Sequence, residues 1–191
     1  ELYNFTYDQF SIYIPLKKKM DLLSKKLLSF YGHNSQTSIL IAQIYDLISN
    51  NQKVLKSLSL GPTSNIVHGD LTLSNIIVSS ESLFFIDPID HYLGKCILGD
   101  YFKLLFDLDF KLSFRIEGHY KSLEASVIIN ISRLMSELKS ICCSKCQFMP
   151  NIQNIFLAVE ALRVLQYSHR DIKLTDSLLR YIQTKIDHDD L

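Results

Sequence analysis

Apolar residues recur at intervals of three and four over most of the chain, which is the spacing of amphipathic helices. The first such stripe predicts a helix and consists of Leu16, Met20, Leu23, Leu27 and Phe30. Lysines occupy many of the positions between these residues. A basic amphipathic helix can lie on a membrane surface, but a solvated lysine face over a packed core is the commoner case and is our interpretation.

The same period predicts five further helices. The second is expected to begin between Ser35 and Thr37, to run to Leu58 and to stop at Gly61-Pro62. The later ones are predicted at about 101–112, 120–140, 151–168 and 175–187. The expected N-cap residues of the last two are Asn151 and either Thr175 or Asp176.

The period changes to that of β-strands between residues 66 and 86. Three short runs there are β-branched or aromatic, namely Ile66-Val67, Ile76–Val78 and Leu83–Ile86. The polar residues Ser79–Ser82 between the last two runs are typical of a tight turn. The expected fold class is therefore mainly α with a small β hairpin insert (α+β). We expect one domain with a helical part at 1–65, a loop and hairpin at 66–90, and a helical part at 91–191.

The charge balance and the length of the apolar runs limit which partners and which cellular location we expect. Twenty Lys and Arg side chains balance twenty Asp and Glu side chains, so the surface lacks the net field that attracts nucleic acid, and we expect no nucleic-acid partner. No run approaches the ~20 apolar residues of a transmembrane helix, and the first ten residues lack a signal-peptide pattern. We expect a cytoplasmic protein without a transmembrane segment. Because the chain begins with Glu1 and not Met, we also expect it to be a piece of a longer protein.

The four cysteines are too few and too unevenly placed for a disulfide framework. Cys96 stands alone, whereas Cys142, Cys143 and Cys146 form a cluster. The C-x-x-C spacing of the last two is half of a structural zinc site, but no second pair with suitable spacing follows. We interpret them as ordinary free thiols in a reducing compartment.

Polar side chains that can perform chemistry concentrate at the hairpin. His68, Asp70 and Asn75 lie on or beside the loop that enters it, and Asp87 follows its second strand. Turn chemistry explains any one of them, because Asp and Asn bond nearby backbone groups. The hairpin, however, would bring Asp70, Asn75 and Asp87 to the same end. Carboxylate and amide oxygens suit Mg²⁺, which is usually shared with substrate phosphates, and a further carboxylate could accept a hydroxyl proton.

Three motifs resemble the protein-kinase-like superfamily. Residues 68–75, HGDLTLSN, resemble its H-x-D-x-x-x-x-N catalytic loop, in the H-G-D spelling of the aminoglycoside phosphotransferases and choline kinases. Residues 86–88, IDP, resemble the metal-binding segment of that branch, and residues 100–104, DYFKL, are similar to the D-L-A-K-L helix that follows it. The stretch 86–104 looks most like phosphotransferase-family proteins of bacterial capsule and surface-polysaccharide synthesis. The motifs occur in the expected order and span about a fifth of the chain.

The resemblance implies the C-terminal lobe of a protein-kinase-like fold and a role for each motif residue. Asp70 would orient and deprotonate the hydroxyl of a small-molecule acceptor, such as a sugar. Asn75 and Asp87 would hold Mg²⁺ against the phosphates of ATP. His68 and Asp100 would support the loop without touching substrate. The implied activity is ATP-dependent phosphoryl transfer, and positioning and charge neutralisation would supply most of the acceleration.

The chain departs from the family pattern in two places. Thr72 stands where protein kinases often have a phosphate-contacting lysine. Residues 1–65 contain neither a glycine-rich loop nor a V-A-I-K-like strand, so an N-terminal lobe or upstream domain is missing and the nucleotide-binding residues are not identified. We expect the surface that this lobe would cover to expose apolar side chains, which favours a homodimer or pairing with a separate chain.

Two other functions are weighed against the kinase. One is a noncatalytic kinase-like module that binds a partner, which the intact Asp70, Asn75 and Asp87 disfavour. The other is a metal-dependent phosphoesterase, since G-D before an asparagine also occurs there. It ranks last because it needs further His and Asp ligands in motifs that the sequence does not show.

Overall fold

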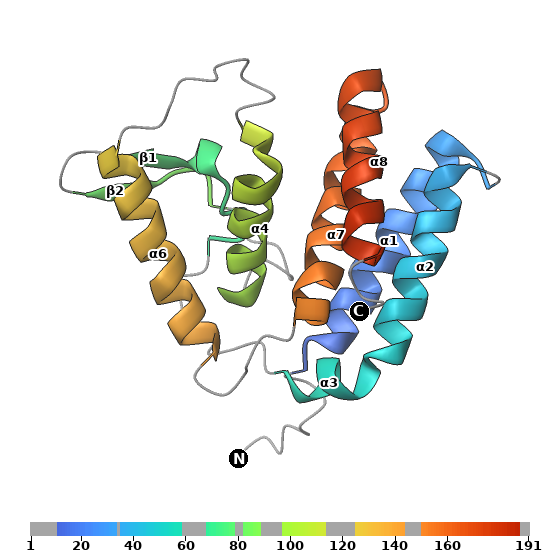
Figure 1. Cartoon of the computed structure of the whole chain (residues 1–191), viewed down its shortest axis with the longest axis horizontal. Coiled ribbons are helices and arrows are strands. Elements are labelled where there is room, and N and C mark those ends of the chain that lie inside the picture. The colour runs from blue at the N-terminus through green and yellow to red at the C-terminus, as the bar shows by residue number, and fades with distance from the viewer. Residues whose placement is uncertain are drawn as a thin grey trace, which may run out of the picture. The chain divides into compact units, whose positions relative to one another are not determined.

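The computed structural model describes residues 11–33, 35–58, 68–78, 82–88, 97–113, 125–143 and 150–187. Within these ranges the chain is mostly helical and contains one two-stranded antiparallel sheet (Figure 1). The prediction of a mainly α protein with a small β hairpin is therefore confirmed. The chain divides into two compact units, one made of residues 1–59 with 148–191 and the other of residues 60–147.

The first unit is helical and is built from both ends of the chain. Its elements are α1 (Tyr13–Tyr31), α2 (Gln36–Asn50), α3 (Gln52–Ser57), α7 (Pro150–Ser168) and α8 (Ile172–Asp187). Helix α7 contacts α1, α2 and α8 and is buried along most of its surface, so it forms the centre of this unit (Figure 1). Its core includes Met20, Leu27, Leu40, Ile44, Ile155, Leu162, Leu178 and Ile182.

Two predictions for the first helices need correction. Four members of the predicted apolar stripe of α1 are buried, but Phe30 is 53% exposed. Its ring stacks on that of His169 with 4.9 Å between centroids. The single helix predicted up to Leu58 is two helices, α2 and α3, that meet at Asn51. The side-chain Nδ2 of Asn51 donates to Leu47 O at 2.9 Å, a local bond of the kind that competes with helix continuation.

The predicted N-cap residues are right in one place and wrong in two, and α4 (Ile97–Phe110) and α6 (Ala125–Cys143) replace the helices predicted at 101–112 and 120–140. Ser35 caps α2, because its Oγ accepts a hydrogen bond from the Ser38 N–H at 3.3 Å. Helix α8 begins at Ile172, because Asp171 Oδ1 accepts from the Leu174 N–H at 3.0 Å, so neither Thr175 nor Asp176 is its N-cap. Asn151 is not a cap either, since α7 already begins at Pro150, a residue that suits the first helical turn.

The second unit carries the hairpin. It contains the 3₁₀ turn η2 (Leu73–Asn75), strands β1 (Ile76–Val78) and β2 (Leu83–Phe85), and helices α4 (Ile97–Phe110) and α6 (Ala125–Cys143). Two of the three predicted strands are confirmed, the second of them ending at Phe85 and not at Ile86, with Ile76 opposite Phe85, Ile77 opposite Phe84 and Val78 opposite Leu83. Ile76 packs with Leu71 and Leu104 in a cluster that leucines from α6 also contact. The hairpin thus rests one face on α4 and α6.

The opposite face of the hairpin is apolar and open. Ile77 and Phe84 form a cross-strand pair and are 51% and 55% exposed. Successive side chains of a strand alternate between faces, which is why Ile77 is exposed where Ile76 is buried. Ile86, the residue after β2, is also exposed.

Some predictions fall outside the described residues. These are the strand-like run Ile66-Val67, the stop at Gly61-Pro62, most of the turn after Val78, and the thiols Cys96 and Cys146. Among the helices that the structure describes, none is long and apolar enough to cross a membrane.

Candidate active site

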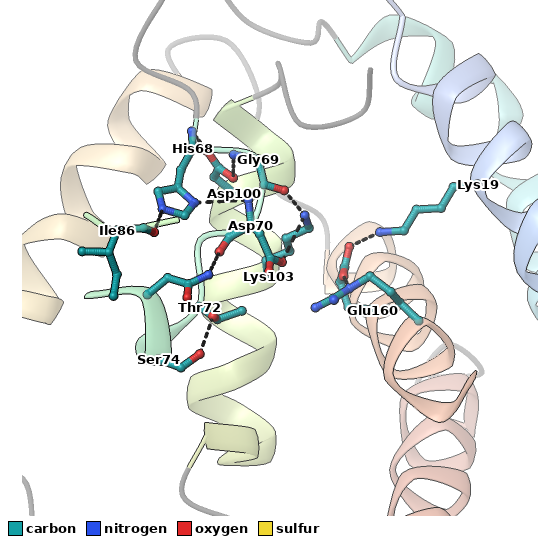
Figure 2. A network of polar contacts seen from close by, with 12 residues as sticks. Lys19, His68, Gly69, Asp70, Thr72, Ser74, Ile86, Asp100, Lys103 and Glu160 are labelled. Carbon is teal, nitrogen blue, oxygen red and sulfur yellow. Dashed lines mark hydrogen bonds and ion pairs between the residues drawn. The ribbon is translucent and has the colours of Figure 1, made fainter. Parts of the chain in front are cut away.

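Hydrogen bonds hold the loop from His68 to Asn75 against the start of α4 (Figure 2). The Asp100 carboxylate accepts hydrogen bonds from the backbone N–H groups of His68, at 2.7 Å, and of Gly69, at 2.9 Å. Gly69 has φ of 85°, which glycine adopts without steric cost. The chain can therefore turn at Gly69 and present two successive N–H groups to one carboxylate.

Three polar residues of α4 hold the loop from one side. Asp100, Lys103 and Asp107 are spaced by three and four residues, so they share a helix face. Lys103 Nζ donates to Gly69 O and lies 3.5 Å from Asp70 Oδ1. Asp107, which is fully buried, accepts from the Leu73 N–H at 2.7 Å. The helix thus fixes both the beginning and the end of the loop.

Asp107 also binds the segment after α4. Its carboxylate accepts from the Ser113 N–H at 2.8 Å and from Ser113 Oγ at 2.6 Å. These bonds satisfy a carboxylate that would be costly to bury alone. The same side chain therefore connects η2 to the end of α4.

The His68 ring connects the loop to the end of the hairpin. Its Nδ1 accepts from the Asp70 N–H at 3.3 Å, so the hydrogen lies on Nε2, which donates to Ile86 O at 2.6 Å. The Ile86 N–H in turn donates to Asn75 O at 3.0 Å. Ile86 is thereby bound through both its backbone groups, immediately before Asp87.

Asp70 and Asn75 are brought into direct contact. Asn75 Nδ2 donates to the backbone oxygen of Asp70 at 2.8 Å. Because the amide is planar, this bond turns Oδ1 of Asn75 away from Asp70 O and leaves it available as an oxygen ligand. Thr72, two residues after Asp70, is buried and its hydroxyl lies 2.9 Å from that of Ser74.

Asp87 stands at the same end of the hairpin, with an unusual backbone. It follows Ile86, whose bond to Asn75 extends the pairing of the strands. Its φ of 53° lies in the left-handed region, and its side chain is exposed. The structure therefore joins Asp70 to Asn75 by a hydrogen bond, and Asp87 follows Ile86, whose backbone binds Asn75 and the His68 ring.

Burial has the largest effect on the pKa of Asp100, the carboxylate that holds the loop. Asp100 is 4% exposed, and the loss of hydration raises the pKa of its carboxyl. The bond from the His68 N–H, the charge of Lys103 and the bond from the Gly69 N–H act in the opposite direction. The surroundings of Asp100 thus counter much of the cost of burying its charge.

The donor set suits magnesium better than a transition metal. In the described part of the chain, no three His, Cys, Asp or Glu side chains gather in a group that could hold an ion. Mg²⁺ needs no such group, because one or two protein oxygens, phosphate oxygens and water complete its shell. The Asn75 amide and the Asp87 carboxylate are oxygen donors of this kind.

The sequence motifs assign no role to Lys103 or Asp107. The spacing of polar residues along 97–110, ILGDYFKLLFDLDF, does indicate a shared helix face, because Asp100, Lys103 and Asp107 recur every three or four positions in a mostly apolar helix. Such a stripe usually faces solvent. Here it faces the loop, which only the packing shows.

Comparisons with other proteins leave the family open. No protein-family model matches the sequence. No curated protein and no solved structure matches it either. The site must therefore be interpreted from its own chemistry.

Proposed function

We propose that this chain carries the catalytic loop of an ATP-dependent phosphotransferase with a protein-kinase-like C-terminal lobe. Its acceptor would be a hydroxyl of a sugar or other small metabolite, in keeping with the resemblance to proteins of surface-polysaccharide synthesis. One observation carries the proposal, namely that the three motifs are joined by hydrogen bonds. Asp100 binds the backbone of His68 and Gly69, and His68 binds Ile86 next to Asp87.

In the proposed reaction each motif side chain has one role. The Asp70 carboxylate accepts the proton of the acceptor hydroxyl as its oxygen bonds to the γ-phosphorus. The bond from that phosphorus to the bridging oxygen of the β-phosphate breaks, and ADP leaves. When bound, Mg²⁺ would neutralise phosphate charge. Asn75 and Asp87 are the residues that would hold it, and the bond from the Ile86 N–H to Asn75 O supports this assignment, because it links Asn75 to the residue before Asp87.

Replacement of Asp70 by asparagine tests the proposal. We expect Asp70→Asn, which is nearly isosteric but cannot take a proton, to lower kcat by about 10²- to 10⁴-fold. Folding and binding of Mg²⁺-ATP should persist, because the backbone oxygen that Asn75 binds is retained. ADP release is measured with a panel of sugars and other small alcohols, on the full-length protein that the gene encodes.

The matched control is Asp109→Asn, an exposed position of α4. It should keep wild-type turnover. Wild-type turnover by Asp70→Asn with every acceptor would refute the role of Asp70. Phosphate release without any nucleotide would instead indicate a phosphoesterase.

One observation favours a noncatalytic binding module as the second candidate. The exposed apolar side chains of Ile77, Phe84 and Ile86 lie on or directly after strands that begin and end next to Asn75, and an exposed apolar group can mark an interaction site. In a kinase these side chains would adjoin bound nucleotide. In a binding module they would contact a partner chain. The absence of ATP consumption in both wild type and Asp70→Asn, together with normal folding of both, would favour the module.

A further inference from the structure

Lys103 lies beside Asp70 and has no role in the reaction proposed above. It comes from α4, one turn after Asp100, and its side chain is 13% exposed. The loop itself contains no lysine or arginine between His68 and Val78. The positive charge next to Asp70 is therefore supplied by the helix.

The two carboxylate oxygens of Asp70 have different surroundings. Oδ1 is buried, and it is the oxygen that lies 3.5 Å from Lys103 Nζ. The side chain as a whole is nevertheless 30% exposed, and Oδ2 is its other oxygen. A hydroxyl that arrives from solvent thus meets Oδ2 and not Oδ1.

The position of the Lys103 ammonium is fixed by a hydrogen bond, so it attracts Oδ1 of Asp70 more strongly than Oδ2. Its hydrogen bond to Gly69 O anchors it on the residue before Asp70. That residue is itself fixed, because its N–H is bound by Asp100 from the same helix. Because the pair is partly buried, salt and water screen the attraction between Lys103 and Oδ1 less than at an open surface.

We propose that Lys103 is a positioning residue that turns Asp70 so that Oδ1 faces α4 and Oδ2 faces the acceptor hydroxyl. This inference rests on the phosphotransferase function. In the reaction Oδ2 takes the proton, the acceptor oxygen bonds to the γ-phosphorus, and ADP departs with the electrons of the broken bond. Without Lys103 the carboxylate can rotate, and the aligned fraction of molecules falls.

The test compares Lys103→Met and Lys103→Arg in the full-length protein. We expect Lys103→Met to lower kcat by roughly 10- to 100-fold while the KM values for acceptor and ATP stay unchanged, because alignment and not binding is lost. Lys103→Arg should restore most of kcat, since it keeps the charge and a donor. On the Asp70→Asn background, Lys103→Met should cause no further loss, because the two residues act as one unit.

Lys111→Met is the control, because Lys111 is exposed at the end of the same helix. It should leave kcat and both KM values unchanged. Wild-type kcat in Lys103→Met would overturn the inference. An equal further loss on the Asp70→Asn background would overturn it too, as would a lower melting temperature with unchanged kcat per folded molecule.

A crystal structure of Lys103→Met separates this inference from the proposed function. If the wild type transfers phosphate to none of the acceptors, the proposed function fails, but the orientation of Asp70 is still observable. A carboxylate turned away from α4 in the variant supports the positioning role. A carboxylate that keeps Oδ1 against α4 without the ammonium overturns it.

Discussion

Among single residues, Asp87 combines a strained backbone with an exposed carboxylate. A left-handed φ costs a non-glycine residue roughly 1–2 kcal/mol, and Asp87 adopts it directly after a residue that is bound on both sides. Aspartate tolerates this conformation better than most residues, because its short polar side chain can bond locally. Backbone strain next to a candidate site motivates the hypothesis that the carboxylate is what the position requires.

Paired substitutions separate these two properties of Asp87. We expect Asp87→Gly to be about 0.5–1 kcal/mol more stable than Asp87→Ala in metal-free buffer, because glycine removes the strain. Both variants should weaken Mg²⁺-dependent ATP binding to the same extent, since both lack the carboxylate. Thermal or urea denaturation measures the first difference, and calorimetric titration measures the second.

Lys111 provides the control for this comparison, because it also has a left-handed φ, of 58°. Lys111→Gly should likewise be more stable than Lys111→Ala, while ATP binding stays as in the wild type. ATP binding retained by Asp87→Ala would show that Asp87 merely ends the strand.

At the scale of helices and strands, periodicity predicted most of the described elements, but neither where they end nor that α2 and α3 are separate helices. The stripe of α1 and the alternation in the hairpin both reflect burial of one face, which the sequence displays directly. Helix ends depend on single side chains that compete for the same N–H groups. Asp171, and not Thr175, caps α8, and the Thr175 hydroxyl instead donates to Ser168 O at 2.8 Å.

The site was predictable to a similar degree. His68, Asp70 and Asn75 stand out because they interrupt an apolar run within eight residues. Lys103 and Asp107 do not stand out, because a polar residue on a helix has the same pattern whether it faces solvent or a loop. That distinction depends on packing between segments that are about 30 residues apart, which periodicity does not report.

The interface of α1 with α7 contains a charged triad around a buried glutamate. Glu160 is 3% exposed and accepts hydrogen bonds from Lys19, on α1, and from Arg163 Nε at 2.7 Å. We expect Glu160→Ala to destabilise the protein by about 1–3 kcal/mol, because two partly exposed positive charges then lose their hydrogen bonds to the same carboxylate. Chemical denaturation measures the loss.

Two variants test this explanation. Glu137→Ala, at an exposed position of α6, should change stability by no more than about 0.5 kcal/mol. The triple variant Lys19→Met, Glu160→Leu, Arg163→Met should be close to wild type, because apolar residues of similar size need no counter-charge. A triple variant as unstable as Glu160→Ala would show that packing, and not charge, causes the loss.

For the molecule as a whole, the two units have separate cores. Leu162 of α7 and Leu104 of α4 are both fully buried, each within its own unit. Leu→Ala at either position should cost about 2–5 kcal/mol. We expect hydrogen exchange to accelerate mainly in α1, α2, α7 and α8 for Leu162→Ala, and mainly in α4, α6 and the hairpin for Leu104→Ala. Equal acceleration everywhere in both variants would show that the chain opens as one cooperative body.

The helical unit that joins both ends of the chain has a consequence for synthesis on the ribosome. Helices α1 and α2 emerge before α7 and α8, which they contact and which lie beyond the hairpin-bearing unit in the sequence. The roughly 90 residues between Leu58 and Pro150 take on the order of 5 to 20 s to translate at ~5–20 residues per second. Throughout that interval the apolar faces with Met20, Leu27 and Ile44 lack their final cover. The nascent chain therefore offers a binding surface for chaperones, which the completed fold removes.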